Sequence, residues 1–393
     1  MTILKIAKGV LKSTVEVPAS KSYANRALIV AAIKNSTFTI HNLPESTDVT
    51  LLLQAFPKIG LKLERKVSSC TIHNSFPDCE GSGATLEVGE GGTTARFLAA
   101  LLLRGQKPYT LILGEKLKTR PWSEFLELVA GLGARAVLKD NELHLQGPLL
   151  LQGELEVDCG RTTQFASGLQ LAYADQKIKI IPTHMTSSQS YWRMTEKLIG
   201  EILQGTSYSV PLDWSSASYP LAFGALNQEI FFPGLQYDQY QADSKFYQLL
   251  KSLGAIEDGA DGIRVKPLKS TRDVELDVVD CLDLVPALGF LLSHLSGQHI
   301  LRGIANLEHK ESNRLQECLK LFKKFSKTAY LENDRLVILG PGKTQMGKMN
   351  LELPNDHRMV MTGTLFLLQH NGGSVEPSEA VSKSYPEFFS ILK

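Results

Sequence analysis

Short clusters of small polar residues, each followed by an apolar run, recur along this chain. The first is Pro18–Ile33, which reads P-A-S-K-S-Y-A-N-R-A-L-I-V-A-A-I. Its nearly all-apolar body predicts a buried helix that begins about Ser20 or Ser22, either of which can cap it. Similar starts occur at Gly89–Arg96, Gly160–Gln164, Asp280–Asp283 and Asn355–Arg358.

A second pattern joins an amphipathic helix to two short strands with a polar turn. Phe125–Gly133 followed by Ala136–Leu145 is one example, and Phe246–Gly254 followed by Gly262–Val265 is another. A glycine ends each helix, and alternating or β-branched residues follow it. These segments predict repeated helix–strand–strand units.

The two halves of the chain resemble each other at one offset. Ser188-Gln-Ser-Tyr191 matches Ser382-Lys-Ser-Tyr385, which is an offset of 194 residues, and Arg120 falls opposite Arg314. Such self-similarity predicts two similar α/β domains of about three repeat units each. We expect residues 18–239 to form the first domain, and residues 1–17 with 240–393 to form the second.

Composition excludes several classes of protein. The 393 residues carry 42 Lys plus Arg against 41 Asp plus Glu, so the net charge of +1 gives no general attraction to nucleic acid or membrane. The longest apolar run, Phe97–Leu103, is too short to span a bilayer. The N-terminus lacks a signal-peptide core. The five scattered cysteines form no metal-binding spacing, which favours reduced thiols in a cytoplasmic protein.

Cations at predicted helix starts indicate a binding site for anions. Lys21 and Arg26 fall in the first turns of a helix, where the positive end of the helix dipole repels cations. An anion bound between them would offset this repulsion. Backbone N–H groups, a hydroxyl and two cations suit phosphate or carboxylate. The competing interpretation is a solvated basic helix start.

If the repeat brings the helix starts to one interdomain cleft, the cations outnumber the acids there, which predicts more than one small polyanion as ligand. Carboxylates beside lysines are candidate proton-transfer groups. The chain has no Walker motif, dinucleotide fingerprint, His/Cys metal cluster or G-x-S-x-G elbow. The expected cations are Lys21, Arg26, Arg120, Lys310, Arg314, Arg358 and Lys383, and the acids are Asp48, Asp283, Glu311 and Asp356.

These motifs together resemble one family. P-A-S-K-S-Y-A-N-R-A-L looks like the N-terminal signature of the 5-enolpyruvylshikimate-3-phosphate synthase family, within the enolpyruvyl transferases. The resemblance covers nearly the whole chain and implies an inside-out α/β barrel of six βαβαββ-type units in two domains. The later motifs, similar and in the same order, are G-E-G-G-T-T-A-R, T-R-P-W, T-T-Q-F, S-Q-S-Y, S-S-A-S-Y, H-K-E-S-N-R-L, N-D-H-R-M and S-K-S-Y-P.

The resemblance implies transfer of the enolpyruvyl group from phosphoenolpyruvate to the 5-hydroxyl of shikimate 3-phosphate, with release of phosphate and with no metal or other cofactor. The implied catalytic residues are Lys21, Asp283, Glu311 and Lys383. The implied contacts of shikimate 3-phosphate are Lys21, Ser22, Arg26, Thr162, Thr163, Gln164, Ser188, Asp283 and Lys310. The implied contacts of phosphoenolpyruvate are Lys21, Gly92, Arg120, Gln164, Arg314, Arg358 and Lys383. We also expect a monomer.

Several residues depart from the family pattern. Glu90 stands where Asn is usual, Asn313 replaces an Asp, and Arg193 stands where an acid is common. Thr162 and Thr163 replace two serines and keep the hydroxyl groups. Asp280 is the alternative to Asp283 as the acid, and sensitivity to the inhibitor glyphosate stays open.

Two other functions compete with this interpretation. The sister enzyme that acts on UDP-N-acetylglucosamine typically carries a cysteine in the loop before the Arg-Pro pair, and Gly114–Arg120 has none. A non-catalytic binding homologue is the second alternative. Glu90 and Asn313 favour it, whereas Lys21, Glu311 and Arg314 argue against it.

Overall fold

The computed structural model describes residues 2–342 and 347–393. The chain folds into two compact units. One, the central unit, is Ala19–Pro211, and the other, the terminal unit, joins Met1–Pro18 to Leu212–Lys393. The N-terminal strand belongs to the terminal unit, where β1 (Leu4–Ile6) pairs antiparallel with β20 (Gly373–Glu376).

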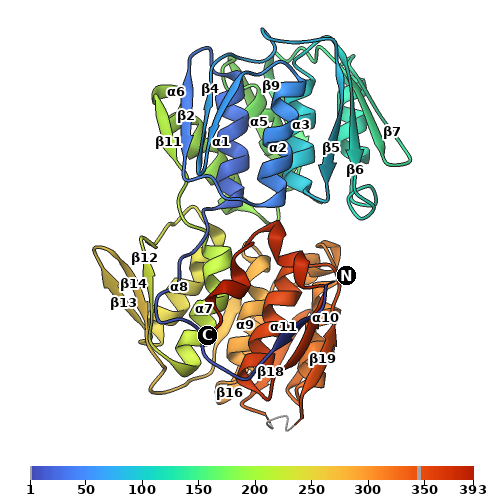
Figure 1. The fold of residues 1–393 in the computed structure, drawn as a ribbon. Coiled ribbons are helices and arrows are strands. Elements are labelled where there is room, and N and C mark those ends of the chain that lie inside the picture. The colour runs from blue at the N-terminus through green and yellow to red at the C-terminus, as the bar shows by residue number, and fades with distance from the viewer. Residues whose placement is uncertain (1, 343–346) are drawn as a thin grey trace. The chain divides into compact units, whose positions relative to one another are not determined.

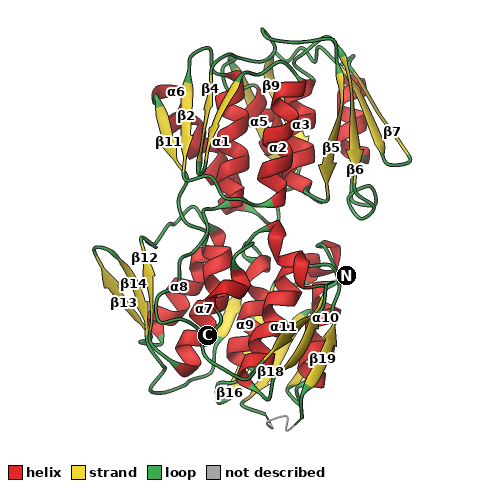
Figure 2. Ribbon diagram, viewed as in Figure 1, coloured by secondary structure: helices red, strands yellow, loops and turns green. Residues whose placement is uncertain are grey.

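The central unit places its helices between small sheets (Figures 1 and 2). Its helices are α1 (Lys21–Ile33), α2 (Thr47–Lys58), α3 (Gly92–Leu102), α4 (Ser123–Gly131), α5 (Gln164–Ala172) and α6 (Gln189–Gln204). Its strands are β2 (Phe38–His41), β3 (Leu63–Lys66), β4 (Ser69–Ile72), β5 (Ala84–Gly89), β6 (Pro108–Leu113), β7 (Arg135–Lys139), β8 (Glu142–Gln146), β9 (Gly153–Asp158), β10 (Ile178–Thr183) and β11 (Ser207–Ser209).

The sheet β5-β6-β8-β7 shows how a repeat unit is built. A parallel pair, β5 and β6, is joined through α3, and the hairpin of β7 and β8 then adds antiparallel to β6 after α4. Leu111 pairs with Leu86 on one side and Leu143 on the other, and all three are fully buried. The alternation seen in the sequence therefore directs one row of side chains into the core. The order β11-β2-β4-β3 repeats this plan, and β9 and β10 form a parallel pair.

The terminal unit repeats the plan. Its helices are α7 (Trp214–Asn227), α8 (Lys245–Ser252), α9 (Val285–Leu292), α10 (Arg314–Lys324) and α11 (His357–Gln369), with short 3₁₀ turns at Ala242–Ser244, Leu282–Leu284, Ala305–His309, Ser378–Lys383 and Phe388–Ile391. Its other strands are β12 (Ile230–Pro233), β13 (Ile256–Gly259), β14 (Gly262–Val265), β15 (Glu275–Asp277), β16 (Gly297–Arg302), β17 (Thr328–Glu332), β18 (Arg335–Gly340) and β19 (Met349–Glu352). The sheets are β1-β20-β19, β12-β14-β13 and β15-β16-β18-β17.

Three apolar helices fill the core of each unit. In the central unit α1, α3 and α5 contact one another, and in the terminal unit α7, α9 and α11 do the same. A helix that is apolar on every side is stable only when neighbours cover it completely. Gly168 of α5 allows close packing, since a Cβ there would lie 3.1 Å from the backbone oxygen of Arg96 in α3.

The helix–strand–strand pattern predicted from the sequence is present. α4 is followed by the β7–β8 hairpin, and α8 by the β13–β14 hairpin. Gly133 and Gly254 follow these helices with φ of +82° and +75°, a backbone conformation that glycine adopts without strain. The predicted fold class, two similar halves of repeated βα units, is confirmed.

The second crossing between the units differs from the expected boundary at 239/240. It lies between Pro211 and Leu212. Trp214 of α7 and Phe232 of β12 belong to the same hydrophobic core as Leu288 of α9, and β12 pairs with β14. Burial of these side chains fixes α7 and β12 in the terminal unit. Among the described residues, no helix is both long enough and apolar enough to cross a membrane.

Candidate functional site

The first turns of α1, α3 and α5 lie together in the central unit. Asn25 Nδ2 donates to Thr93 Oγ1 at 3.0 Å and so joins α1 to α3, and Gly92 adjoins Gln164 at the start of α5. None of the three helices carries an acid in its first turn. Their N-terminal N–H groups and positive dipole ends therefore meet in one region that favours an anion.

Two arginines and a glutamine surround Gly92. A Cβ on Gly92 would lie 3.0 Å from Gln164 Oε1 and 3.1 Å from Arg120 Nη1. Arg96 donates to Gln164 Oε1 at 2.5 Å and to the carbonyl oxygen of Pro121 at 2.9 Å. Burial first, and then the nearby cation Arg120, lowers the pKa of Arg96 to about 9. The pair Arg96 and Arg120 makes this region electropositive.

Lys21 pairs with a carboxylate of the chain. Its Nζ lies 2.9 Å from Asp48 Oδ2, and the two side chains are only 18% and 4% exposed. Ser20 occupies the N-cap position of α1 but its side chain makes no capping hydrogen bond, although the sequence suggested that it could. Asp48 thus pairs with Lys21 in the free protein, and the bound anion that the sequence predicts between Lys21 and Arg26 stays a prediction.

Arg26 lies inside the central unit and is 2% exposed. It donates from Nε to Thr195 Oγ1 at 2.9 Å and from Nη1 to the backbone oxygen of Ser22 at 2.9 Å. Its Nη2 makes only a long contact of 3.5 Å with the backbone oxygen of Tyr191. Burial lowers the pKa of Arg26 to about 10. Arg26 therefore connects α1 to α6, and Nη2 makes the longest of these three hydrogen bonds.

The expected hydroxyl groups stand at helix starts. Thr163 is the N-cap of α5, and Thr162 Oγ1 accepts from the backbone N–H of Gln164 at 3.3 Å. Ser188 is the N-cap of α6 with φ of +65°. The structure thus places Thr162 and Thr163 with Gln164, and Ser188 next to Gln189 on another helix.

In the terminal unit, Asp283 is held by three cations. Its carboxylate lies 2.6 Å from Arg314 Nη1, 3.0 Å from Arg358 Nη2 and 3.4 Å from Lys310 Nζ. Burial alone would raise the pKa of Asp283, but Arg358, Lys310 and Arg314 outweigh it and hold the pKa well below its usual range. Of the two acids that the sequence offered, Asp283 is the one in this cluster.

A second acid, the buried Asp356, fixes the guanidinium of Arg314. Asp356 Oδ2 accepts from Arg314 Nε at 2.8 Å and from Ser312 Oγ at 2.9 Å, while Oδ1 caps α11 by accepting from the N–H of Arg358. Asp356 is fully buried and Arg314 is 2% exposed. The guanidinium is therefore held between Asp283 and Asp356 in one orientation.

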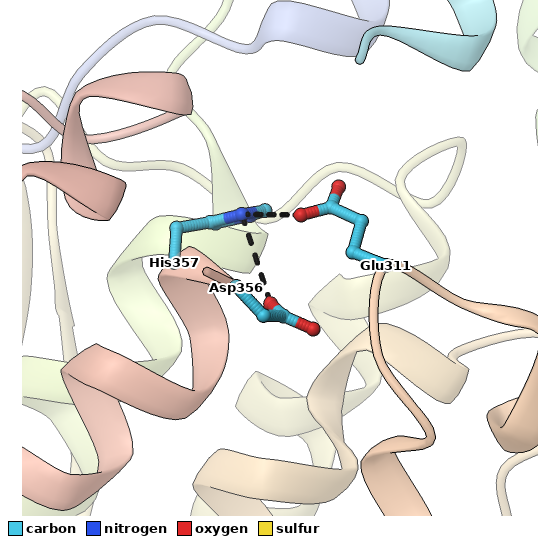
Figure 3. Close-up of side chains that lie close together, drawn as sticks. All are labelled: Glu311, Asp356 and His357. Carbon is cyan, nitrogen blue, oxygen red and sulfur yellow. Dashed lines mark hydrogen bonds and ion pairs between the residues drawn. The ribbon is translucent and has the colours of Figure 1, made fainter. Parts of the chain in front are cut away.

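Glu311, His357 and Lys383 form the third part of this site. Figure 3 shows Glu311 and His357 beside Asp356. His357 Nδ1 lies 3.0 Å from Glu311 Oε2, and Lys383 Nζ lies 2.8 Å from Glu311 Oε1. Burial would raise the pKa of Glu311, but Lys383, His357 and Arg314 hold it well below its usual range. Burial lowers the pKa of His357, although the nearby carboxylate of Glu311 acts to raise it. The lowered pKa favours a neutral ring that donates a hydrogen bond from Nδ1.

Oxygen and nitrogen atoms of Glu311, Asp356 and His357 lie within 4.8 Å of one another, a spacing that could hold a metal ion. The same carboxylates already pair with Lys383 and Arg314. A metal ion would have to compete with two cations, so this donor set fits a proton-transfer site better than a metal centre. That no metal is needed stays a prediction.

Sequence reasoning missed several residues of these clusters. His357 and Arg96 were considered only as members of their sequence motifs, and Asp243 was not singled out. Asp243 is 3% exposed, and burial first, then Asp283, raises its pKa to about 7. Arg96 lies one turn after Gly92, a spacing that could have indicated a shared face.

Two departures from the family pattern have a local explanation. Asn313 is the N-cap of α10, and its Oδ1 accepts from the N–H of Gln316 at 3.1 Å. An Asp in this position could make the same hydrogen bond. Arg193 is exposed on α6.

Comparisons with known proteins agree over the whole chain. The sequence model of the EPSP synthase (3-phosphoshikimate 1-carboxyvinyltransferase) family matches residues 6–202 and 187–392. The 3-phosphoshikimate 1-carboxyvinyltransferase of Thermococcus kodakarensis is 31% identical over 403 residues, which cover 98% of this chain and 97% of that protein. The enzyme of the same name from Syntrophobacter fumaroxidans is 28% identical over 410 residues, with coverage of 98% and 97%.

Solved structures share the fold. EPSP synthase from Acinetobacter baumannii superimposes with a TM-score of 0.80 at 22% identity and covers 99% of this chain and 97% of its own. The enolpyruvyl transferase NikO from Streptomyces tendae superimposes with a TM-score of 0.77 at 14% identity, with coverage of 99% and 96%. Together with the full-length relatives, these matches confirm the predicted 3-phosphoshikimate 1-carboxyvinyltransferase activity. The chain belongs to the EPSP synthase (3-phosphoshikimate 1-carboxyvinyltransferase) family.

Proposed function

We propose that the two clusters serve one reaction, in which the enolpyruvyl group passes from phosphoenolpyruvate to the 5-hydroxyl of shikimate 3-phosphate and phosphate is released. One observation carries this proposal. Glu311 lies between Lys383 and the neutral ring of His357, while Asp283 lies against Arg314 and Arg358. A proton-transfer group thus stands beside cations that suit a phosphate and a carboxylate.

We assign the binding of the two anionic substrates to the charged and polar residues of the two clusters. Arg120, Gln164, Gly92 and Lys21 of the central unit would bind phosphoenolpyruvate. In the terminal unit Arg314, Arg358 and Lys383 would bind it. The proposed contacts of shikimate 3-phosphate are Lys21, Ser22, Arg26 through Nη2, Thr162, Thr163, Gln164, Ser188, Asp283 and Lys310. These assignments rest on residue chemistry and on the family pattern.

Glu311 is the proposed acid and base at the methylene carbon. A proton passes from its carboxyl group to that carbon, the substrate hydroxyl oxygen bonds to the neighbouring carbon, and the hydroxyl proton leaves to a base. Glu311 then takes a proton back from the new methyl group as the carbon–oxygen bond to phosphate breaks. Lys21 and Lys383 are candidates for the groups that carry the hydroxyl proton.

The charge balance of the free protein constrains this scheme. Glu311 is ionised while Lys383, His357 and Arg314 surround it, since they hold its pKa well below the usual range. A bound phosphate that pairs with Lys383 and Arg314 would weaken that stabilisation and raise the pKa of Glu311. Substrate binding itself would therefore prepare Glu311 to carry a proton.

Asp283 suits a different task. Its depressed pKa makes it a weak base, and its carboxylate already accepts from Arg314 and Arg358. We propose that it orients the attacking hydroxyl and holds the two arginines in place. Because three cations lower the proton affinity of the Asp283 carboxylate, we do not expect Asp283 to be the main base that removes the hydroxyl proton.

The test is phosphate release with shikimate 3-phosphate and phosphoenolpyruvate, each omitted in turn, with UDP-N-acetylglucosamine as the rival acceptor. Release that requires both of the first two compounds supports the proposal. Release with the rival acceptor would contradict it. Binding of shikimate 3-phosphate without any release would indicate the non-catalytic homologue. The monomeric state and cytoplasmic location stay predictions.

A further inference from the structure

We propose that Glu90, which stands where the family usually has Asn, is a positioning residue that holds the loop Gly114–Arg120 and thereby sets the place of Arg120. This inference rests on the proposed function of Arg120 in binding phosphoenolpyruvate. It concerns a carboxylate that the sequence analysis left unexplained beside an anion site.

The carboxylate of Glu90 is bonded to the backbone of that loop. Oε2 accepts from the N–H of Leu117 at 2.9 Å, and Oε1 accepts from the N–H of Lys116 at 3.3 Å. The loop turns there like the start of a helix, with the N–H of Lys118 donating to the carbonyl oxygen of Gly114 at 3.0 Å. Glu90 therefore satisfies donors that such a turn leaves without an internal partner.

The sheet brings the two segments together. Glu90 directly follows β5 and Gly114 directly follows β6, and these neighbouring parallel strands end side by side. The N–H of Gly114 donates to the carbonyl oxygen of Gly89 at 2.8 Å. A Cβ on Gly114 would lie 2.4 Å from the carboxyl carbon of Glu90. Gly114 thus leaves the space that the carboxylate occupies.

The loop transmits this restraint to Arg120. Leu117 is fully buried. Its carbonyl oxygen accepts two hydrogen bonds, one from Trp122 Nε1 at 3.1 Å and one from the backbone N–H of Arg120 at 3.2 Å. Arg120 Nη1 lies beside Gly92, 3.1 Å from where a Cβ would be. These hydrogen bonds form a continuous series from Glu90 through Leu117 to Arg120.

This arrangement also accounts for a negative charge near an anion site. Both oxygens of Glu90 are directed to backbone N–H groups of the loop. Hydrogen bonds from backbone donors offset much of the charge of a carboxylate. An Asn side chain is one methylene shorter, and its second terminal group is an NH2 donor, so it cannot direct a separate oxygen to each of these N–H groups.

The experiment compares steady-state kinetics of Glu90→Ala, Glu90→Gln and Gly114→Ala with the unchanged protein. Gly114→Ala displaces the carboxylate and changes no charge. Loss of two charge-assisted hydrogen bonds should raise KM for phosphoenolpyruvate about tenfold in Glu90→Ala and Gly114→Ala, and less in Glu90→Gln. KM for shikimate 3-phosphate should stay within about twofold. Glu115→Gln is the matched control, since Glu115 lies on the same loop and pairs with Lys118 at 2.8 Å.

A double-mutant cycle with Arg120→Ala separates positioning from general destabilisation. If Glu90 acts through Arg120, Glu90→Ala adds no further rise in KM for phosphoenolpyruvate in the Arg120→Ala protein. An equal rise in both backgrounds, or equal rises for the two substrates, would overturn the inference.

Trypsin cleavage at Lys116 and Lys118 measures the loop without substrate. Faster cleavage in Glu90→Ala and Gly114→Ala, but not in Glu115→Gln, supports anchoring of the loop, and unchanged cleavage contradicts it. If cleavage rises while Arg120→Ala leaves KM for phosphoenolpyruvate unchanged, then the role proposed for Arg120 fails and the anchoring by Glu90 stands.

Discussion

His357 Nδ1 lies 3.0 Å from Glu311 Oε2, on the side of the carboxylate opposite to Lys383, whose Nζ lies 2.8 Å from Oε1. Each oxygen of Glu311 thus has its own donor. The buried ring of His357 cannot turn away without loss of this bond, so it fixes the direction of the carboxylate. A proton-transfer group held in this way loses little entropy when it reacts.

The first prediction concerns Lys383→Met. Loss of the nearest cation raises the pKa of Glu311, because Lys383 is the first of the charges that lower it. The alkaline limb of the pH profile of kcat/KM, where Glu311 loses the proton that it donates, should move to higher pH, and kcat/KM at neutral pH should fall about a hundredfold.

Lys320→Met is the control for this variant, since Lys320 pairs with Glu317 on the exposed face of α10. It should leave both the profile and kcat/KM unchanged. An alkaline limb that stays in place in Lys383→Met would contradict the assignment of Glu311.

The second prediction concerns the pair of Lys21 and Asp48. Lys21→Ala should abolish most turnover and leave the 4%-exposed carboxylate of Asp48 without this partner, which costs about 1–3 kcal/mol of stability. The double variant Lys21→Ala with Asp48→Asn should regain stability and remain inactive. Thermal unfolding and phosphate release measure the two effects, and recovery of turnover in the double variant would rule out a catalytic role for Lys21.

The third prediction concerns Gly92→Ala. The new methyl group would lie 3.0 Å from Gln164 Oε1 and 3.1 Å from Arg120 Nη1, both at the ends of side chains that can move. The protein should fold normally, while KM for phosphoenolpyruvate rises about tenfold or more, in line with a shift of 1 Å in a binding group. Gly131→Ala, where a Cβ meets nothing within 4 Å, is the control. An equal effect on both substrates would argue against this placement of phosphoenolpyruvate.

The fourth prediction concerns Asp243. Burial first, then Asp283, raises its pKa from 3.8 to about 7, with a smaller contribution from Asp213 and against the opposing effect of Arg358. Its contribution to stability is present below pH 3.8 and is lost as the pH rises through about 7. Asp243→Asn should therefore raise the melting temperature more at pH 8 than at pH 5. The same change at both pH values would show that Asp243 titrates normally.

The fifth prediction concerns a buried histidine pair away from the proposed site. His294 Nε2 lies 3.3 Å from His370 Nε2, and burial first, then Lys327, lowers their pKa values to about 3 and about 4. A pKa below the unfolded value of 6.5 means that stability is present above pH 6.5 and lost as the pH falls.

Each histidine should lower the free energy of unfolding by up to about 2–3 kcal/mol as the pH falls from 6.5 to 4.5. In His370→Phe, the free energy of unfolding should fall less between pH 7 and pH 4.5 than in the unchanged protein. The introduced phenyl ring can pack on Phe325 and Phe366, which contact His370. His73→Phe, which replaces a histidine near Glu64 whose side chain is 40% exposed, is the control. An equally steep acid limb in His370→Phe would contradict the buried neutral pair.

The sequence by itself determined the repeated plan of this protein. Apolar bodies such as Ala27–Ile33 must be buried on every side, and helix–glycine–hairpin units such as α4 with β7 and β8 can be recognised from local periodicity. It also grouped Asp283, Glu311, Arg314 and Lys383 with charged residues of the other half, because most of these residues stand near helix starts and match a family pattern.

Only the tertiary structure decided which groups pair. Lys21 contacts Asp48 from the next helix, Glu311 contacts His357 across 46 residues, and Glu90 bonds to a loop after the neighbouring strand. Such contacts depend on packing between elements, which local periodicity does not encode. The boundary after Pro211 was missed for the same reason. The apolar run of α7 would suit either core, and its packing against α9 and α11 assigns it to the terminal unit.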